Sequence, residues 1–237
     1  MTTSLRRVVA GLFLFGISFG YVEAAVVIYL RALYEPLRQR LTPGRPPGEL
    51  FPLLDRSRML AEAPETGRLL TIEVIREAAT IVMLAAAAML VTGGRGMWLP
   101  AFSVVFGVWD ISFYLFLKVW IDWPASLLTW DILFLLPVPW VAPVLAPVIV
   151  AFTIVGSGLA ALYRPVYIRP LEWIALFLGG ALVILSFTWD FQNVLAGNLP
   201  RPFAWWLFLA GDLFSLGTFS RAYLRTPEHA YLGRDHP

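Results

Sequence analysis

Residues 8–30 read VVAGLFLFGISFGYVEAAVVIYL, and Glu23 is the only charged residue among them. An α-helix needs about 20 mainly apolar residues to cross the hydrocarbon core of a bilayer. Arg6 and Arg7 precede the stretch as they would in a signal peptide. However, the apolar run continues past Glu23 to Leu30, and no clear small-residue cleavage site follows it. The stretch therefore predicts a transmembrane helix that stays in the protein.

Five further stretches have the length and apolar character of a span, namely residues 69–92, 98–121, 140–163, 171–190 and 203–220. The chain is 59% hydrophobic and has a mean hydropathy of +0.72, whereas soluble domains are about 45–50% apolar. These features predict an all-α, polytopic transmembrane helix bundle of about six spans. We expect one transmembrane domain over residues 1–224, with a loop over 32–68 rich in proline and arginine, and a polar tail over 225–237.

The segment over residues 124–163 is too long to be one span. As a single helix, its 40 residues would extend about 60 Å, which is twice the thickness of the hydrocarbon core. Four prolines, at positions 137, 139, 143 and 147, each remove a backbone donor. We therefore predict a half-length helix over 124–136, capped by Asp122 and ended by the prolines, that re-enters the membrane or lies along its surface. One long kinked helix is the alternative.

Arginines near the ends of the spans favour one orientation. On the side of the N-terminus they are Arg6, Arg7, Arg95, Arg164, Arg169, Arg221, Arg225 and Arg234. The opposite side has Arg201 and, within the first loop, Arg38, Arg40, Arg45, Arg56 and Arg58 together with five acids. Cytoplasmic loops carry the excess of basic residues, so we predict that both termini are cytoplasmic. When the first loop is counted, the two sides of the membrane have nearly equal numbers of arginines.

Charged residues inside the apolar spans are the main functional signal. They are Glu23, Glu73, Arg76, Glu77, Asp110, Lys118, Asp131 and Asp212. An unpaired charge at the centre of a bilayer costs about 2.5–3.5 kcal/mol on insertion scales. Such side chains are therefore expected to face the interior of the bundle, where they pair, take up a proton or bind a ligand.

The depths of these acids predict that they converge. At 1.5 Å per residue, Glu23 and Glu77 lie about 12–13 Å from the same membrane surface, and Asp131 lies about as deep if the half-helix re-enters the membrane. Asp110 and Asp212 come out near the middle of the membrane. The sequence thus predicts one polar pocket in the non-cytoplasmic half of the bundle.

Helical spacing supports this prediction. Residues three and four positions apart share a face of a helix, which groups Glu73, Arg76 and Glu77 with Thr80, and Asp110 with Tyr114 and Lys118. On the first helix, Gly16 and Gly20 form a track of small residues that allows another helix to approach closely.

Ion pairing is the alternative explanation of these charges. Arg76 would pair with Glu23 or Glu73, and Lys118 with Asp110 or Asp131. The six deep acids nevertheless outnumber the two bases, which leaves four negative charges if all are ionised. That state is not tenable in a medium of low dielectric. Either several acids hold protons or cations enter the pocket, and both are typical of sites that handle protons or cations.

The sequence also excludes some chemistry. It has no cysteine, and its two histidines, His229 and His236, lie in the polar tail. We therefore expect no haem and no metal held by cysteine or histidine, whereas a cation with oxygen ligands remains compatible. No basic stripe interleaved with aromatic residues predicts nucleic-acid binding. The expected partners are the lipid bilayer and a small cation or solute.

Four strings resemble those of a family of bacterial multi-pass membrane proteins of about six helices to which no activity is assigned. They are GYVEA (20–24), REAAT (76–80), WDISFY (109–114) and TWDILFLLPVPW (129–140), and they lie in the first two-thirds of the chain. The resemblance implies a location in the bacterial cytoplasmic membrane. It implies nothing about chemistry.

Three functions remain open from the sequence. The favoured one is transport of a cation, or of a solute coupled to protons, with the deep carboxylates as ligands or proton carriers. The second is an enzyme acting on a lipid or isoprenoid, with carboxylates as general acid and base or as ligands of a divalent metal. The third is a non-catalytic assembly subunit whose charges only set helix pairing.

Overall fold

The computed structural model describes residues 2–41, 61, 65–92, 96–164, 166–196, 198 and 200–227. Over these residues the chain forms six long helices: α1 (Thr2–Leu41), α3 (Glu65–Thr92), α4 (Trp98–Ile121), α5 (Leu145–Tyr163), α6 (Pro170–Thr188) and α8 (Trp205–Arg225). A short helix, α7 (Phe191–Leu195), follows α6. Each predicted span coincides with one of the long helices, with ends that agree to within about five residues except for α1, which extends well beyond 8–30 at both ends. The prediction of an all-α helical bundle is therefore confirmed.

Five of these helices are long and apolar enough to cross a membrane: α1, α3, α4, α5, and α6 with its continuation into α7. Large apolar side chains cover their outer faces; Leu90 of α3 is 84% exposed and Phe177 of α6 is 72% exposed. Contiguous apolar surface of this extent is not stable in water. The chain is therefore a multi-pass integral membrane protein. The more polar α8 pairs with α6 along its length, and a sixth crossing by α8 remains a prediction.

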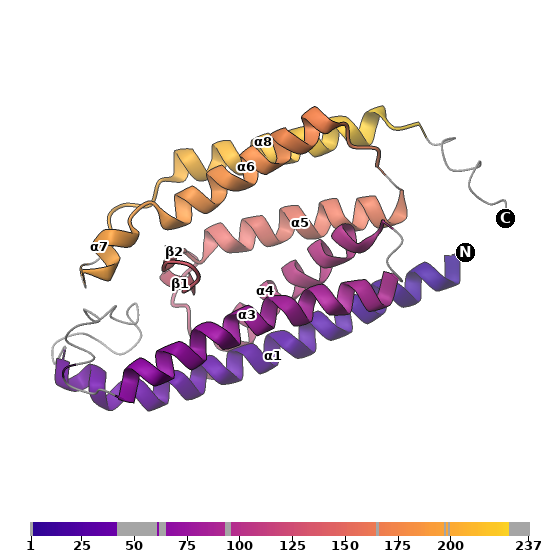
Figure 1. The fold of residues 1–237 in the computed structure, drawn as a ribbon. Helices are drawn as coiled ribbons and strands as arrows, with labels where there is room; N and C mark the ends of the chain where they lie inside the picture. Colours follow the sequence, from indigo (N-terminus) through magenta and orange to yellow (C-terminus); the bar gives the residue numbers. More distant parts are fainter. Residues whose placement is uncertain are drawn as a thin grey trace.

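The bundle has two sides joined by α5 (Figure 1). Helices α1 and α3 pack on α4 to form one side, and the pair α6–α8 forms the other; α5 packs against α4 and also contacts α8. The N-terminal end of α1 and the C-terminal end of α8 lie at the same end of the bundle (Figure 1). The connection between α4 and α5, and helix α7, lie toward the opposite end.

Glycines allow the closest helix pairs to form. A Cβ atom at Gly16 of α1 would lie 2.8 Å from Cγ1 of Val108, and one at Gly20 would lie 2.8 Å from the Trp109 carbonyl oxygen on α4. On the other side, a Cβ at Gly211 of α8 would lie 2.6 Å from the Gly179 carbonyl oxygen on α6. Small residues allow this close packing, which drives helix association in lipid. The track predicted on the first helix therefore does pack against another helix.

The connection between α4 and α5 corrects two expectations. Instead of a half-helix over 124–136, or one long kinked helix, it forms a β-hairpin of β1 (Trp130–Phe134) and β2 (Trp140–Pro143). The strands are antiparallel, with Trp130 opposite Pro143 and an irregularity between Ile132 and Phe134. Asp122 does not cap a new helix; it ends α4 in the left-handed region, at φ 52°.

The prolines explain why the half-helix does not form. The residue before a proline is driven toward extended conformations, which affects Leu136 and Val138 at the turn of the hairpin. Strand pairing then satisfies the backbone groups that a broken helix would leave unpaired. Two of the four prolines, Pro137 and Pro139, therefore lie in the turn of a hairpin and do not mark the end of a helix.

Some predicted boundaries change or remain open. Helix α1 continues to Leu41, so the first ten residues of the predicted loop over 32–68 are helical. The rest of that loop up to residue 60, and residues 228–237 of the predicted tail, lie outside the described residues. The division into one domain and a tail therefore stays a prediction.

Candidate functional site

A cavity of about 880 Å³ lies between the two sides of the bundle and against the hairpin. Of the nine side chains selected from the sequence, eight line it: Glu23, Glu73, Arg76, Glu77, Asp110, Tyr114, Asp131 and Asp212. They come from α1, α3, α4, β1 and α8. The tertiary structure thus brings the deep acids to one cavity, while their roles in binding remain a prediction.

Arg76 holds two of the acids in a compact cluster. Its Nη1 donates to Oε2 of Glu23 at 2.7 Å, and its Nη2 and Nε donate to the two carboxylate oxygens of Glu73 at 2.6 and 2.9 Å. The Thr80 hydroxyl lies within 3.4 Å of the same Glu23 oxygen. This arrangement is the predicted ion pairing of Arg76. We call Glu23, Glu73, Arg76 and Thr80 the Arg76 cluster.

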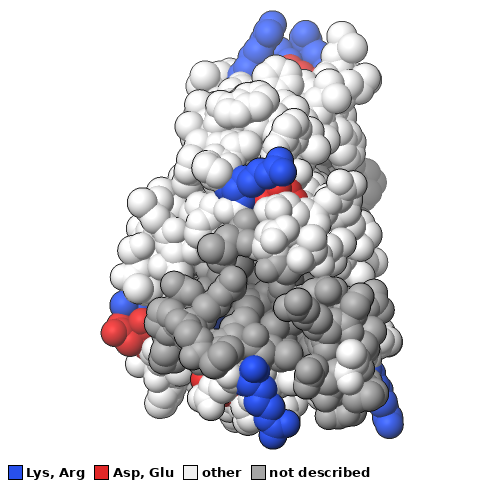
Figure 2. Space-filling model, turned by 90° about the vertical axis from the view of Figure 1, so that its left-hand side faces the viewer, with Lys and Arg blue, Asp and Glu red and all other residues white. Residues whose placement is uncertain are grey.

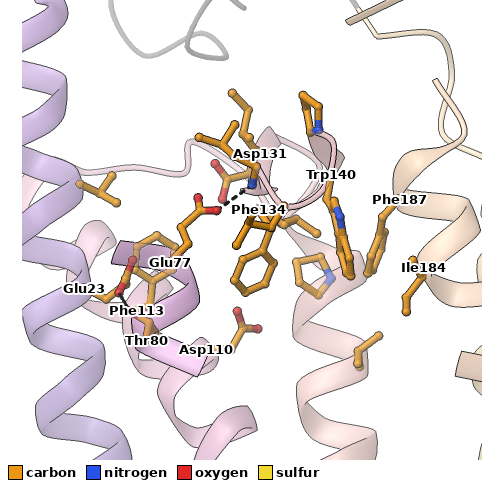
Figure 3. A pocket seen from close by; sticks show the side chains of 18 of the residues that line it. Glu23, Glu77, Thr80, Asp110, Phe113, Asp131, Phe134, Trp140, Ile184 and Phe187 are labelled. Atoms are coloured by element: carbon orange, nitrogen blue, oxygen red, sulfur yellow. Dashed lines mark hydrogen bonds between the residues drawn. The ribbon is translucent and has the colours of Figure 1, made fainter. Parts of the chain in front are cut away.

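Glu77 connects α3 to the hairpin. Its Oε2 accepts a hydrogen bond from the backbone N–H of Leu135 at 2.9 Å (Figure 3). Leu135 directly follows β1, so this carboxylate satisfies a backbone donor at the turn of the hairpin. Glu77 is buried, and within the described residues it has no basic partner in an ion pair. Its one hydrogen-bond donor in the described residues is therefore a neutral backbone group, and Arg76 of the same helix attracts it without forming an ion pair.

Asp131 of β1 faces groups from α1 and α4. The Tyr114 hydroxyl donates to its Oδ2 at 2.9 Å, and the Arg31 guanidinium is close enough to attract the carboxylate. Arg31 itself stacks over the Trp123 ring, 4.1 Å from its centroid. Asp131 lies in the connection between two spans, and burial raises its pKa to about 6 although Arg31 acts in the opposite direction. Its charge state therefore changes near neutral pH.

Asp110 is the acid with the fewest partners. Among the residues that the structure describes, it makes no hydrogen bond and no ion pair, although it lines the cavity from the middle of α4. The carboxylate of Asp131 is near enough to repel it. Figure 3 places Asp110 below Phe134 and the hairpin, on the same side of the cavity as Glu23 and Glu77. Asp110 is partly buried, and a charge without a partner is costly away from bulk water, so this position favours a proton or a bound cation.

Asp212 lies on the opposite wall. It is buried on α8, and its Oδ2 accepts a hydrogen bond from the Thr153 hydroxyl of α5 at 3.2 Å. The depth estimate placed it near the middle of the membrane together with Asp110, and both line the cavity. Asp212 is nevertheless separated from the Arg76 cluster because it belongs to the α6–α8 side.

Lys118 does not reach the cavity. Its Nζ is 2.6 Å from Oδ1 of Asp122 and donates to the carbonyl oxygen of Pro124 at 3.1 Å. Both partners of the ion pair are substantially exposed, at 48% and 90% of their side chains. The expected pairing of Lys118 with Asp110 or Asp131 is therefore wrong. The physical reason is position: Lys118 is in the last turn of α4, where its long side chain reaches the end of the helix.

Arg31, and not Lys118, is the basic residue that lies near Asp131. Arg31 directly follows the predicted first span, and it lines the cavity beside Asp131. Its spacing was the missed signal, because Glu23, Val27 and Arg31 are four residues apart and share a face of α1. The cavity still has six carboxylates against two guanidinium groups, which leaves four negative charges if all acids are ionised.

Aromatic rings form the wall between the acids and α6. Ring centroids are 6.4 Å apart between Trp109 and Phe134, 5.7 Å between Phe134 and Trp140, and 6.2 Å between Trp140 and Phe187. In Figure 3 the labelled acids lie toward α1, α3 and α4, whereas Trp140, Phe187 and Ile184 lie toward α6. The cavity therefore has an acidic side and an aromatic, apolar side.

A search for metal-binding groups and a comparison with known proteins add no assignment to the site. In the described part of the chain, no group of three or more histidine, cysteine, aspartate or glutamate side chains is placed to hold a metal ion. Comparison of the chain with protein-family models, with curated proteins and with solved structures found no significant match. The fold and the site thus define a multi-pass membrane protein with a carboxylate-lined cavity, and the resemblance to a bacterial family stays a prediction.

Proposed function

We propose that the protein transports an organic cation across the membrane in exchange for protons, with the cavity beside the hairpin as its binding site. The observation that carries this proposal is Asp110, a deep carboxylate that has no partner among the described residues and faces a cavity with an excess of acid. A carboxylate in such a place is stable only when it is protonated or when a cation lies next to it. When a cation replaces the proton on such a carboxylate, cation binding is coupled to proton release.

The size and walls of the cavity support an organic cation. Ligand pockets for drug-sized molecules have volumes of about 300–1,000 Å³, and this cavity, at about 880 Å³, is near the upper limit. Aromatic faces such as those of Trp109, Phe134 and Trp140 attract ammonium groups, by about 2 kcal/mol or more where water is excluded. A metal ion would instead need several oxygen ligands at about 2.0–2.6 Å, and no described cluster provides them.

An assembly subunit would explain only part of the site. Paired charges that fix helix packing are found in the Arg76 cluster, which ties α1 to α3. Asp110 and the surplus of acids have no such role, because their charges are not matched by bases. A transport function accounts for both sets of acids. The Arg76 cluster holds the helices together, and the unmatched acids form the binding site.

We place this transport in a bacterial cytoplasmic membrane with both termini cytoplasmic. The arginines near the span ends support this orientation, because Arg164, Arg169, Arg221 and Arg225 belong to the end of the bundle that holds the start of α1. Figure 2 looks at the opposite end, where most of the described surface is uncharged. The hairpin would then lie on the non-cytoplasmic side.

Proteoliposomes test this proposal. The purified protein is reconstituted with a pH-sensitive dye inside, and tetramethylammonium, larger quaternary amines and protonated amines are added outside. We expect proton release from vesicles containing wild type and the control Lys118→Gln, since Lys118 lies outside the cavity. Asp110→Asn and Asp131→Asn should reduce the rate at least tenfold. Absence of proton movement in wild type with every cation, or unchanged rates in both variants, would overturn the proposal.

A further inference from the structure

The cavity has a second part that the proposed cation site does not use. It lies between α5 and α6 and is lined by Val150, Ile154, Gly180, Val183 and Ile184, and we call it the apolar limb. It is continuous with the acidic side, since both belong to one cavity. The polar side chains nearby, Asp212 and Ser215, are on α8, and Asp212 already accepts the Thr153 hydroxyl.

Two neighbouring glycines of α6 show that the apolar limb is open space. A Cβ atom at Gly179 would lie 2.8 Å from the Gly211 carbonyl oxygen, so this residue is packed tightly against α8. A Cβ atom at Gly180, the next residue, would meet nothing within 4 Å, and Gly180 lines the cavity. Protein interiors are normally close-packed. A lining position with this much free space marks volume that is available to a ligand.

The apolar limb also faces outward. Ile184 lines the cavity and is 45% exposed on the surface of α6. It is followed along the chain by Leu185, which is 43% exposed. Surface of this kind on a spanning helix faces lipid. The limb therefore lies next to the lipid-facing surface of α6.

We infer that the ligand is an amphipathic cation, whose ammonium group lies at Asp110 and Asp131 and whose hydrocarbon chain fills the apolar limb. This inference rests on the proposed function and adds the class of substrate to it. A short, fully hydrated amine would leave the limb empty, and a neutral lipid would leave the acids unmatched. Only a molecule with both parts satisfies the two sides of the cavity, and such a molecule is able to enter from the bilayer beside α6.

Alkyltrimethylammonium ions of increasing chain length test the inference. Their binding to the full-length, detergent-purified protein is measured by equilibrium dialysis, and uptake by micelles is subtracted with Asp110→Asn protein in the same detergent. Each pair of added methylene groups should tighten binding to wild type by about sixteenfold up to the length of the limb, because burying one methylene group in an apolar site corresponds to about fourfold.

Gly180→Leu should remove this gain with chain length by filling the limb, and it should leave tetramethylammonium binding within twofold of wild type. Leucine is a better helix former than glycine, and the position has free space, so the variant is expected to fold. Gly217→Leu on α8 is the matched control, since a Cβ there also meets nothing within 4 Å and the residue does not line the cavity.

The outcomes separate the two proposals. Equal binding of short and long chains, or the same dependence on chain length in Gly180→Leu and wild type, would overturn the amphipathic ligand while leaving a cation site intact. If tetramethylammonium binds wild type no better than Asp110→Asn, the cation site itself is wrong.

Discussion

The Arg76 cluster and the Asp110–Asp131 pair are two acidic regions on the same cavity, and they differ in how their charge is balanced. In the first, one guanidinium group forms hydrogen bonds with two carboxylates at 2.6–2.9 Å. In the second, two carboxylates repel each other; among the described residues Arg31 acts on Asp131, and no base acts on Asp110. The comparison teaches that buried acids have two roles: matched charges hold helices together, and unmatched charges require a ligand or a proton.

The largest expected effect is on stability, and it should differ in direction between the two regions. Arg76→Met leaves Glu23 and Glu73 without their base, which for buried pairs costs about 3–5 kcal/mol. Asp110→Asn removes a charge that has no partner and should leave stability unchanged or raise it. Thermal unfolding in detergent measures both. An equal loss in the two variants would remove the distinction between matched and unmatched acids.

A smaller effect is expected in the pH dependence of cation binding at the Asp110–Asp131 pair. Asp131 has a pKa of about 6, raised by burial against the opposing effect of Arg31, with Tyr114 and Asp110 facing it from α4. A cation binds the ionised form, so its affinity should fall by about tenfold between pH 7.5 and pH 5.

The stability of the ligand-free protein should fall as pH rises, whereas cation affinity should increase. Because the folded-state pKa of Asp131 is raised, its contribution to stability is present at low pH and is lost as pH rises through about 6. Added cation should therefore raise the melting temperature more at pH 8 than at pH 5. Asp131→Asn should weaken this difference, and a larger shift at pH 5 than at pH 8 would contradict the assignment.

The smallest effect is expected outside the cavity. Lys118→Gln breaks the ion pair with Asp122, whose side chain is 90% exposed. Exposed pairs contribute about 0–1 kcal/mol, so unfolding and cation binding should both stay close to wild type. A large loss of binding in this variant would mean that Lys118 belongs to the site after all.

Much of the site was predictable because the energetic cost of burying a charge can be judged for each residue from the apolar sequence around it. Glu23, Glu77, Asp110 and Asp131 each lie in an apolar stretch, and that alone predicts that they turn inward. The pairing of Arg76 was also among the expected possibilities, since its position three residues after Glu73 is a local relation. Arg31 was missed because its role depends on a hairpin strand that lies about 100 residues further along the chain.

The amino-acid sequence by itself determined the membrane environment, the positions of the long helices and the inward-facing stripes of charged residues on them. These follow from hydrophobic length and from the 3.6-residue period, which are local properties of the chain. Only the tertiary structure decided that the proline-rich connection is a hairpin, that Arg31 rather than Lys118 faces Asp131, and that open space remains beside Gly180. Helices in lipid associate through close packing between distant segments, and the sequence of one segment does not specify which neighbour it will meet.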